Sequence, residues 1–203
     1  MAEPAVIFFD VGGVLLSNGW DRVARMEASH EFDLDWEDFQ DRHDFMADSF
    51  ERGETGLDTY LDRTVFYRDR DFSKHDFFEF VKSRSTAFDE SLEVLGRLSA
   101  SGRYVLATLN NESREINNHR IDTFGLRNHF EMFLSSCYLG IRKPDPEIYR
   151  MAVDIVQRSP QECIFVDDRA LNLECAALAG ITPIHFRDAA GLQNDLAAVG
   201  VEI

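Results

Sequence analysis

Six polar residues of this chain stand at or beyond the ends of apolar segments, and their types could serve one chemical site. Three are carboxylates, two are carboxamides and one is an ammonium: Asp10, Asp167, Asp168, Asn110, Asn111 and Lys143. Taken one at a time, such residues usually form turns or cap helices. The adjacent pair Asp167–Asp168 is less common after an apolar run, because neighbouring carboxylates repel each other unless a cation compensates. The combination predicts a site that holds a cation and an anion.

The elements that must position these residues are short apolar runs and helical patterns. Five runs are typical of strands buried in a parallel sheet: 5–9, 104–109, 131–136, 163–167 and 181–186. Three segments have helical spacing of apolar residues: 91–102, 145–158 and 171–180. This alternation predicts an α/β fold with a doubly wound parallel sheet. Because ligands bind outside the carboxyl ends of parallel strands, this fold would bring the six polar residues to one edge.

Residues 21–90 have a different pattern, with no long apolar run and with aromatic residues at helical spacing. The segments TGLD (55–58) and SKHD (73–76) resemble capping boxes, which mark helix starts. We therefore predict a helical domain over 18–90, inserted into a core domain made of 1–17 and 91–203. Its phenylalanines are expected to form the core of this helical insertion.

The composition excludes several classes of protein. The net charge of −16 disfavours binding to nucleic acid and to anionic membranes, and an anionic substrate would need a local positive site or a metal. Three cysteines without CxxC spacing fit neither a disulfide framework nor a zinc site. No apolar stretch has the length of a membrane span, so we expect a soluble, cytoplasmic protein. A homodimer is left open.

Four motifs in this order resemble the haloacid dehalogenase (HAD) superfamily. They are Asp-x-Gly-Gly-Val from Asp10, the Asn110–Asn111 pair, Lys-Pro-x-Pro-x2-Tyr from Lys143, and Asp167–Asp168. The resemblance is strongest to the branch that includes bacterial glucose-1-phosphate phosphatases and the N-terminal phosphatase domain of soluble epoxide hydrolases. It implies a HAD-like Rossmannoid core with a helical C1 cap after the first strand.

The resemblance also implies a function, that of a Mg²⁺-dependent phosphatase acting on a small phosphorylated metabolite such as a sugar phosphate. Asp10 matches the nucleophile that forms an aspartyl-phosphate, and Lys143 matches the cation that neutralises it. The metal ligands would be Asp10, Asp168 and the backbone carbonyl of Gly12, with Asp167 orienting the lysine or a metal-bound water. The phosphate-binding residues would be Asn110, Asn111 and Lys143.

Two positions depart from the usual pattern of that superfamily. Gly12 stands where a second Asp usually protonates the leaving group, and loss of a general acid/base costs roughly 10²–10⁴-fold in rate. The glucose-1-phosphate phosphatase branch resembles this chain in having Gly there. Asn110 stands where Ser or Thr usually touches the phosphate.

These departures keep two alternatives open. One is a binding or regulatory protein that has lost catalysis on the same fold. The other is a metal-independent dehalogenase, which the Asp167–Asp168 pair disfavours. Trp20 and Arg22 are candidates for contact with the substrate, although a packed hinge residue and a surface arginine are the simpler interpretation. His43 is expected at the surface of the cap.

Overall fold

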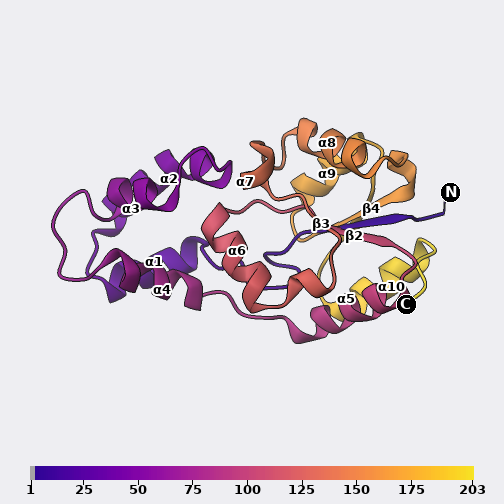
Figure 1. Ribbon diagram of the computed structural model, residues 1–203, viewed down its shortest axis with the longest axis horizontal. Coiled ribbons are helices and arrows are strands. Elements are labelled where there is room, and N and C mark those ends of the chain that lie inside the picture. Colours follow the sequence, from indigo (N-terminus) through magenta and orange to yellow (C-terminus); the bar gives the residue numbers. More distant parts are fainter. Residues whose placement is uncertain (1–2) are drawn as a thin grey trace.

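The computed structural model describes residues 3–203 and is built around one parallel sheet (Figure 1). Its strands are β1 (Val6–Phe9), β2 (Val105–Thr108), β3 (Met132–Phe133), β4 (Cys163–Asp167) and β5 (Thr182–His185). Their order in the sheet is β3-β2-β1-β4-β5, and every neighbouring pair is parallel. The predicted α/β fold with a doubly wound parallel sheet is confirmed.

Helices cover both faces of the sheet because successive side chains of a strand point to opposite faces. On one face, α5 (Asp89–Ser101) and α10 (Ala189–Ala198) pack on a core that includes Ile7 and Phe9. On the other, α8 (Pro146–Val156) and α9 (Ala170–Leu178) pack on a core that includes Val6 and Phe8. Figure 1 shows these two pairs on either side of the strands. Strand β1 is therefore buried on both faces.

The third predicted strand is shorter than its apolar run. It covers two residues rather than 131–136, because Ser135 already caps the short helix α7 (Ser136–Leu139). The chain returns from β2 to this edge through α6 (Arg114–Thr123) and the 3-10 turn η1 (Leu126–Asn128), and a second turn, η2 (Pro160–Glu162), precedes β4. An edge strand has only one neighbour, so fewer ladder hydrogen bonds define its length.

Four helices lie between β1 and α5, and we call them the cap: α1 (Arg22–Glu31), α2 (Trp36–Glu51), α3 (Leu57–Thr64) and α4 (Lys74–Ser83). They have an aromatic core of their own, in which Trp20, Phe39 and Phe77 pack edge to face or tilted. In Figure 1 the cap extends to the left of the sheet, beyond the carboxyl ends of the strands. The domain limits given above stay a prediction.

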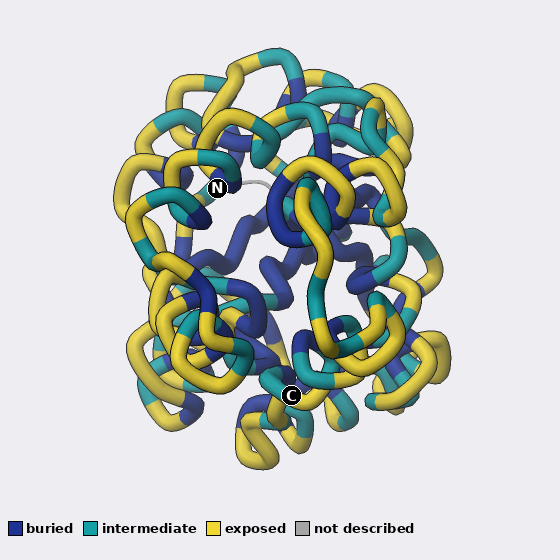
Figure 2. Tube along the Cα trace, turned by 90° about the vertical axis from the view of Figure 1, so that its left-hand side faces the viewer, coloured by how far each residue is buried: buried dark blue, intermediate teal, exposed yellow. Residues whose placement is uncertain are grey.

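The view from the cap end, in Figure 2, shows buried segments in the centre and exposed ones around the rim. Within residues 3–203, none of the helices is both long enough and apolar enough to cross a membrane. All three cysteines are free thiols in this part of the chain.

One of the two predicted capping boxes is confirmed. Ser73 caps α4, and its hydroxyl and the carboxylate of Asp76 exchange hydrogen bonds with each other's backbone N–H. The prediction for 55–58 was wrong, because Gly56 rather than Thr55 precedes the first turn of α3 and no side chain caps it. The Thr55 hydroxyl is instead hydrogen-bonded to the Ser49 hydroxyl at 2.9 Å.

Candidate active site

A buried lysine joins two carboxylates at the carboxyl edge of the sheet. Asp10 follows β1 and Asp167 ends β4, and these neighbouring strands hold the two side chains close together. The Nζ atom of Lys143 lies 3.1 Å from Oδ2 of Asp10 and 2.6 Å from Oδ2 of Asp167. Lys143 is only 2% exposed and Asp167 is 0% exposed. Burial at this depth requires such pairing, since an isolated buried ion is strongly destabilising.

The Asn111 side chain positions Lys143. Its Oδ1 accepts the backbone N–H of Lys143 and its Nδ2 donates to the Lys143 carbonyl, both at 2.8 Å. This reciprocal pair anchors the loop after α7 to the end of β2, across 32 positions of sequence. The ammonium therefore reaches Asp10 from a fixed backbone.

Burial and charge act in opposite directions on Asp10. The net result is a pKa of about 7 for its carboxyl group, raised chiefly by desolvation and also by the charge of Asp167. The Lys143 ammonium and the N–H of Val11, which Oδ1 accepts at 2.8 Å, lower the pKa. Because desolvation is the largest of these effects, a further cation beside Asp10 would favour the ionised carboxylate that a nucleophile needs.

Asp167 and Asp168 are neighbours with different surroundings. Both oxygens of Asp167 are occupied by donors, which include the side chain of Asn172 and the backbone N–H of Arg169. By contrast, the buried Oδ1 of Asp168 has no hydrogen-bond partner among residues 3–203. Desolvation and the charge of Asp167 raise the pKa of Asp168. Asp168 is the carboxylate that is free to accept a cation.

The geometry of this cluster fits a hard divalent cation. One carboxylate oxygen from each of Asp10, Asp167 and Asp168 lies within 4.8 Å of the others. Gly13 has a φ of 79°, and a Cβ there would lie 2.5 Å from Oδ2 of Asp168, so the absence of a side chain lets Asp168 approach the loop. Oxygen ligands in small number are typical of Mg²⁺, which keeps several waters.

The structure brings Gly12 but not the Asn110 side chain to the same space. Gly12 lines the cleft together with Asp10, Asn111 and Lys143. The Asn110 amide is 1% exposed, donates to Asn117 Oδ1 at 3.0 Å and accepts from the Ser135 hydroxyl at 2.9 Å. The Asn110 side chain is therefore engaged behind the site. Its role in phosphate binding stays a prediction.

The cluster opens into a cleft of about 730 Å³ between the cap and the sheet. Six basic and six acidic side chains line it, so its formal charge is zero although the chain carries −16. The basic ones are Arg22, Arg25, Arg120, Arg142, Lys143 and Arg169. The cleft is therefore far less negative than the chain as a whole, which weakens the repulsion of an anionic substrate.

The cap contributes a buried polar network to the cleft. The prediction of a surface His43 was wrong: it is 8% exposed and its Nδ1 is hydrogen-bonded at 2.8 Å to the Tyr60 hydroxyl, which accepts from Nε1 of Trp20 at 2.9 Å. Desolvation, followed by the charge of Arg25, lowers the pKa of His43 to about 3. Trp20 both packs in the cap and lines the cleft, and the exposed Arg22 lies over the Trp36 ring.

Sequence reasoning missed a buried ion pair in the cleft. Nη1 of Arg120 lies 3.2 Å from Oε2 of Glu112, and Arg120 also donates to the Ser85 hydroxyl and the Ser17 carbonyl. Desolvation raises the pKa of Glu112 to about 7. The sequence carries no local signal for this pair, because α6 is polar along its length and nothing in it marks Arg120 as the buried arginine.

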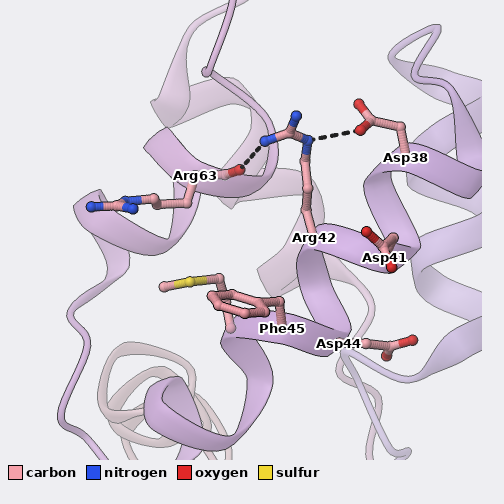
Figure 3. Close-up of a pocket in the computed structure, with 7 residues that line it drawn as sticks. Asp38, Asp41, Arg42, Asp44, Phe45 and Arg63 are labelled. Carbon is pink, nitrogen blue, oxygen red and sulfur yellow. Dashed lines mark hydrogen bonds and ion pairs between the residues drawn. The ribbon is translucent and has the colours of Figure 1, made fainter.

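A second pocket, on the outer surface of the cap, has no comparable chemistry. Figure 3 shows it between α2 and α3, where Arg42 donates to Asp38 and to the carbonyl of Arg63. Phe45, which also lines this pocket, is 86% exposed. The buried ions therefore place the candidate active site in the cleft between cap and sheet.

Comparison with known proteins agrees with this geometry. The sequence profile of haloacid dehalogenase-like hydrolases matches residues 4–180. The chain belongs to this family. The HAD-like hydrolase is 31% identical over 162 residues to Flavin mononucleotide hydrolase 1 of Arabidopsis thaliana, which covers 80% of this chain and 65% of that protein. It is 36% identical over 74 residues to Bifunctional epoxide hydrolase 2 of Rattus norvegicus, or 36% of this chain and 13% of that protein.

The fold of this HAD-like hydrolase is also that of a solved structure. A HAD family enzyme of Bacteroides thetaiotaomicron, in complex with magnesium and inorganic phosphate, matches with a TM-score of 0.74 and 21% identity over 91% of this chain and 95% of that one. The predicted superfamily and the resemblance to epoxide hydrolases are confirmed. The chain spans less than two thirds of the length of both sequence relatives.

Proposed function

We propose that this protein is a Mg²⁺-dependent phosphatase that hydrolyses a small phosphomonoester through an aspartyl-phosphate on Asp10. The observation that carries the proposal is the buried Lys143, fixed between Asp10 and Asp167 beside the unpaired carboxylate of Asp168. A purely structural ion pair would need only one carboxylate for Lys143, but three cluster here. A bound cation would explain the third carboxylate, that of Asp168.

Each side chain has a defined part in the proposed reaction. Asp10 attacks phosphorus. The N–H of Val11 holds its Oδ1, and the ammonium of Lys143 faces its Oδ2, so the carboxylate is oriented for the attack. Lys143 neutralises Asp10 and the phosphoryl oxygens in turn. Asn111 keeps the lysine in place and lines the cleft, so it and Lys143 are the proposed phosphate-binding side chains, while the Asn110 side chain is engaged with Asn117 and Ser135. Positioning and charge neutralisation account for most of the catalysis of phosphoryl transfer.

The proposed metal ligands are Asp10, Asp168 and the carbonyl of Gly12, with Asp167 holding Lys143. When bound, Mg²⁺ would offset the repulsion between the carboxylates and the phosphate dianion. Two observations support this assignment, the clustering of the three carboxylates and the magnesium and phosphate in the related Bacteroides enzyme.

The cleft favours a substrate that extends beyond its phosphate group. Its volume and its arginines fit a polar phosphorylated metabolite, such as a sugar phosphate. The relative from Arabidopsis thaliana is named a flavin mononucleotide hydrolase, so flavin mononucleotide belongs among the candidate substrates.

The test is steady-state hydrolysis of p-nitrophenyl phosphate, a panel of sugar phosphates and flavin mononucleotide, with Mg²⁺ and with a chelator. We expect turnover that requires Mg²⁺ and is lost in Asp10→Asn, while the exposed variant Asp154→Asn keeps the wild-type rate. Turnover that survives both the chelator and Asp10→Asn would contradict the proposal.

The two alternatives give different results in the same assays. A binding protein without catalysis would bind inorganic phosphate and Mg²⁺ in calorimetry and release no phosphate from any ester. A dehalogenase would release halide from a 2-haloacid whether or not a chelator is present. Neither alternative accounts for phosphate release that depends on Mg²⁺ and on Asp10.

A further inference from the structure

The proposed reaction leaves one proton without a carrier. When Asp10 attacks phosphorus, the ester oxygen leaves with an electron pair, and an alkyl oxygen must be protonated. Asp10 is the nucleophile, and Lys143 is occupied by two carboxylates at 3.1 and 2.6 Å. Gly12, which lines the cleft beside Asp10, has no side chain. Another group in the cleft must supply the proton.

The space beside Gly12 leads to the Glu112–Arg120 pair. A Cβ at Gly12 would lie 3.2 Å from Asn18 Oδ1 and 3.5 Å from Nη1 of Arg120. The same Nη1 lies 3.2 Å from Oε2 of Glu112. One guanidinium nitrogen thus separates Glu112 from the position where a side chain of residue 12 would begin.

Glu112 is held in this position from both sides. Its Oε1 accepts the backbone N–H of Ser113 at 2.9 Å, and its own N–H donates to the Ser136 hydroxyl at 3.0 Å. Arg120 is fixed in turn by the Ser85 hydroxyl at 3.0 Å and the Ser17 carbonyl at 2.8 Å. Glu112 is 8% exposed and lines the same cleft as Asp10.

Other titratable groups of the cleft are less suited to carry a proton. Asp21 caps α1, and Asp44 accepts from Gln40 on the cap. Glu51 lies on the cap helix α2 and is paired with Arg142, which is not among the three nearest neighbours of a Cβ at Gly12, whereas Arg120, the partner of Glu112, is. His43 has a pKa lowered to about 3, so it holds no proton to give at neutral pH.

We propose that Glu112 is the general acid and base of this enzyme and replaces the side chain that residue 12 lacks. In the first step, an Asp10 oxygen bonds to phosphorus, the bond from phosphorus to the ester oxygen breaks, and Glu112 gives its proton to that oxygen to form the alcohol. In the second step, a water oxygen bonds to phosphorus, its proton goes to Glu112, and the bond from phosphorus to Asp10 breaks. Inorganic phosphate is released, Asp10 is again a carboxylate, and Glu112 is again protonated.

The charges around Glu112 suit both steps. The charges that act on it most strongly are those of Arg120 on α6, Glu51 on α2 and Asp10 after β1. Desolvation and the two carboxylates raise its pKa, Arg120 lowers it, and the result is about 7. Both protonation states are then accessible at neutral pH, as a group that gives and then takes a proton requires.

The inference rests on the proposed function, and its test compares two leaving groups. p-Nitrophenolate leaves without help, whereas glycerol 2-phosphate needs a proton donor. We expect Glu112→Gln to lower kcat for glycerol 2-phosphate roughly 10²–10⁴-fold and kcat for p-nitrophenyl phosphate less than about 10-fold. Glu112→Asp, which keeps a carboxyl group, should retain more activity on the alkyl ester than Glu112→Gln. Glu174→Gln, on the exposed side of α9, is the control and should match the wild type.

Three results would overturn the inference while leaving the proposed function intact. These are an equal loss on both esters, no loss on either, and a wild type that hydrolyses only the aryl ester. If Glu112→Gln does not fold, Glu112→Asp decides: it should lose more activity on glycerol 2-phosphate than on p-nitrophenyl phosphate, and an equal loss on the two esters would overturn the inference. A wild type that hydrolyses no phosphate ester would overturn the proposed function itself, and the inference with it.

Discussion

Replacing Lys143 by Met tests how far the buried ion cluster holds the fold together. Methionine keeps nearly the length of the lysine side chain and removes only its charge and donors. The substitution leaves two carboxylates, 8% and 0% exposed, that had Nζ at 3.1 and 2.6 Å. Removing one partner of a buried ion pair costs about 3–5 kcal/mol, and here two carboxylates lose the same partner. We expect a loss at the upper end of this range.

The assay is urea unfolding at neutral pH in the presence of a chelator, with the wild type and a matched surface variant. Lys74 also pairs with two carboxylates, Asp62 at 2.7 Å and Asp58 at 3.5 Å, but on the exposed face of the cap. Lys74→Met should leave the unfolding midpoint almost unchanged, because solvent screens exposed pairs.

A double variant separates charge from packing. Asp167→Asn in the Lys143→Met background removes one of the two stranded charges, so the two losses should fall short of additivity by about 1 kcal/mol or more. A Lys143→Met protein that loses less than about 1 kcal/mol, or strict additivity in the cycle, would refute the electrostatic reasoning.

Three further predictions concern Glu112, Tyr60 and Gly53. The folded-state pKa of Glu112 is raised from 4.5 to about 7, so the contribution of this group to stability falls as the pH rises between these values. Glu112→Gln removes this contribution. Urea unfolding should therefore show the variant gaining about 3 kcal/mol relative to the wild type between pH 4.5 and pH 7. A constant difference across that range would contradict the assignment. Tyr60→Phe leaves the Trp20 N–H without its acceptor and should cost about 1–3 kcal/mol by thermal or urea unfolding, whereas an unchanged midpoint would mean that water replaces the hydroxyl. A Cβ at Gly53, where φ is 71°, would clash with the Cys137 carbonyl, whereas a Cβ at Gly102, where φ is 61°, would have nothing within 4 Å. Gly53→Ala should therefore lower the free energy of unfolding by more than Gly102→Ala, as urea unfolding can measure. Equal losses would show that only the backbone conformation matters.

The sequence by itself determined the sheet and the residues at its edge. Apolar runs of five or six residues are typical of strands buried between two layers, so the strands and their covering helices followed from local pattern. Because parallel strands end at one edge, Asp10, Asp167 and Asp168 had to lie near one another. Local chemistry also placed the start of α8, where Asp145 caps the helix and Pro146 opens it.

Tertiary structure alone decided the depth of the site and the partners within it. The burial of Lys143 depends on hydrogen bonds to Asn111, 32 positions away, and no local pattern encodes such a contact. The pairing of Glu112 with Arg120 and the burial of His43 likewise arise where the cap and α6 meet the sheet. Charged and polar residues look alike in sequence whether they face water or a cleft, since their pKa values and their roles are set by neighbours that only the folded chain supplies.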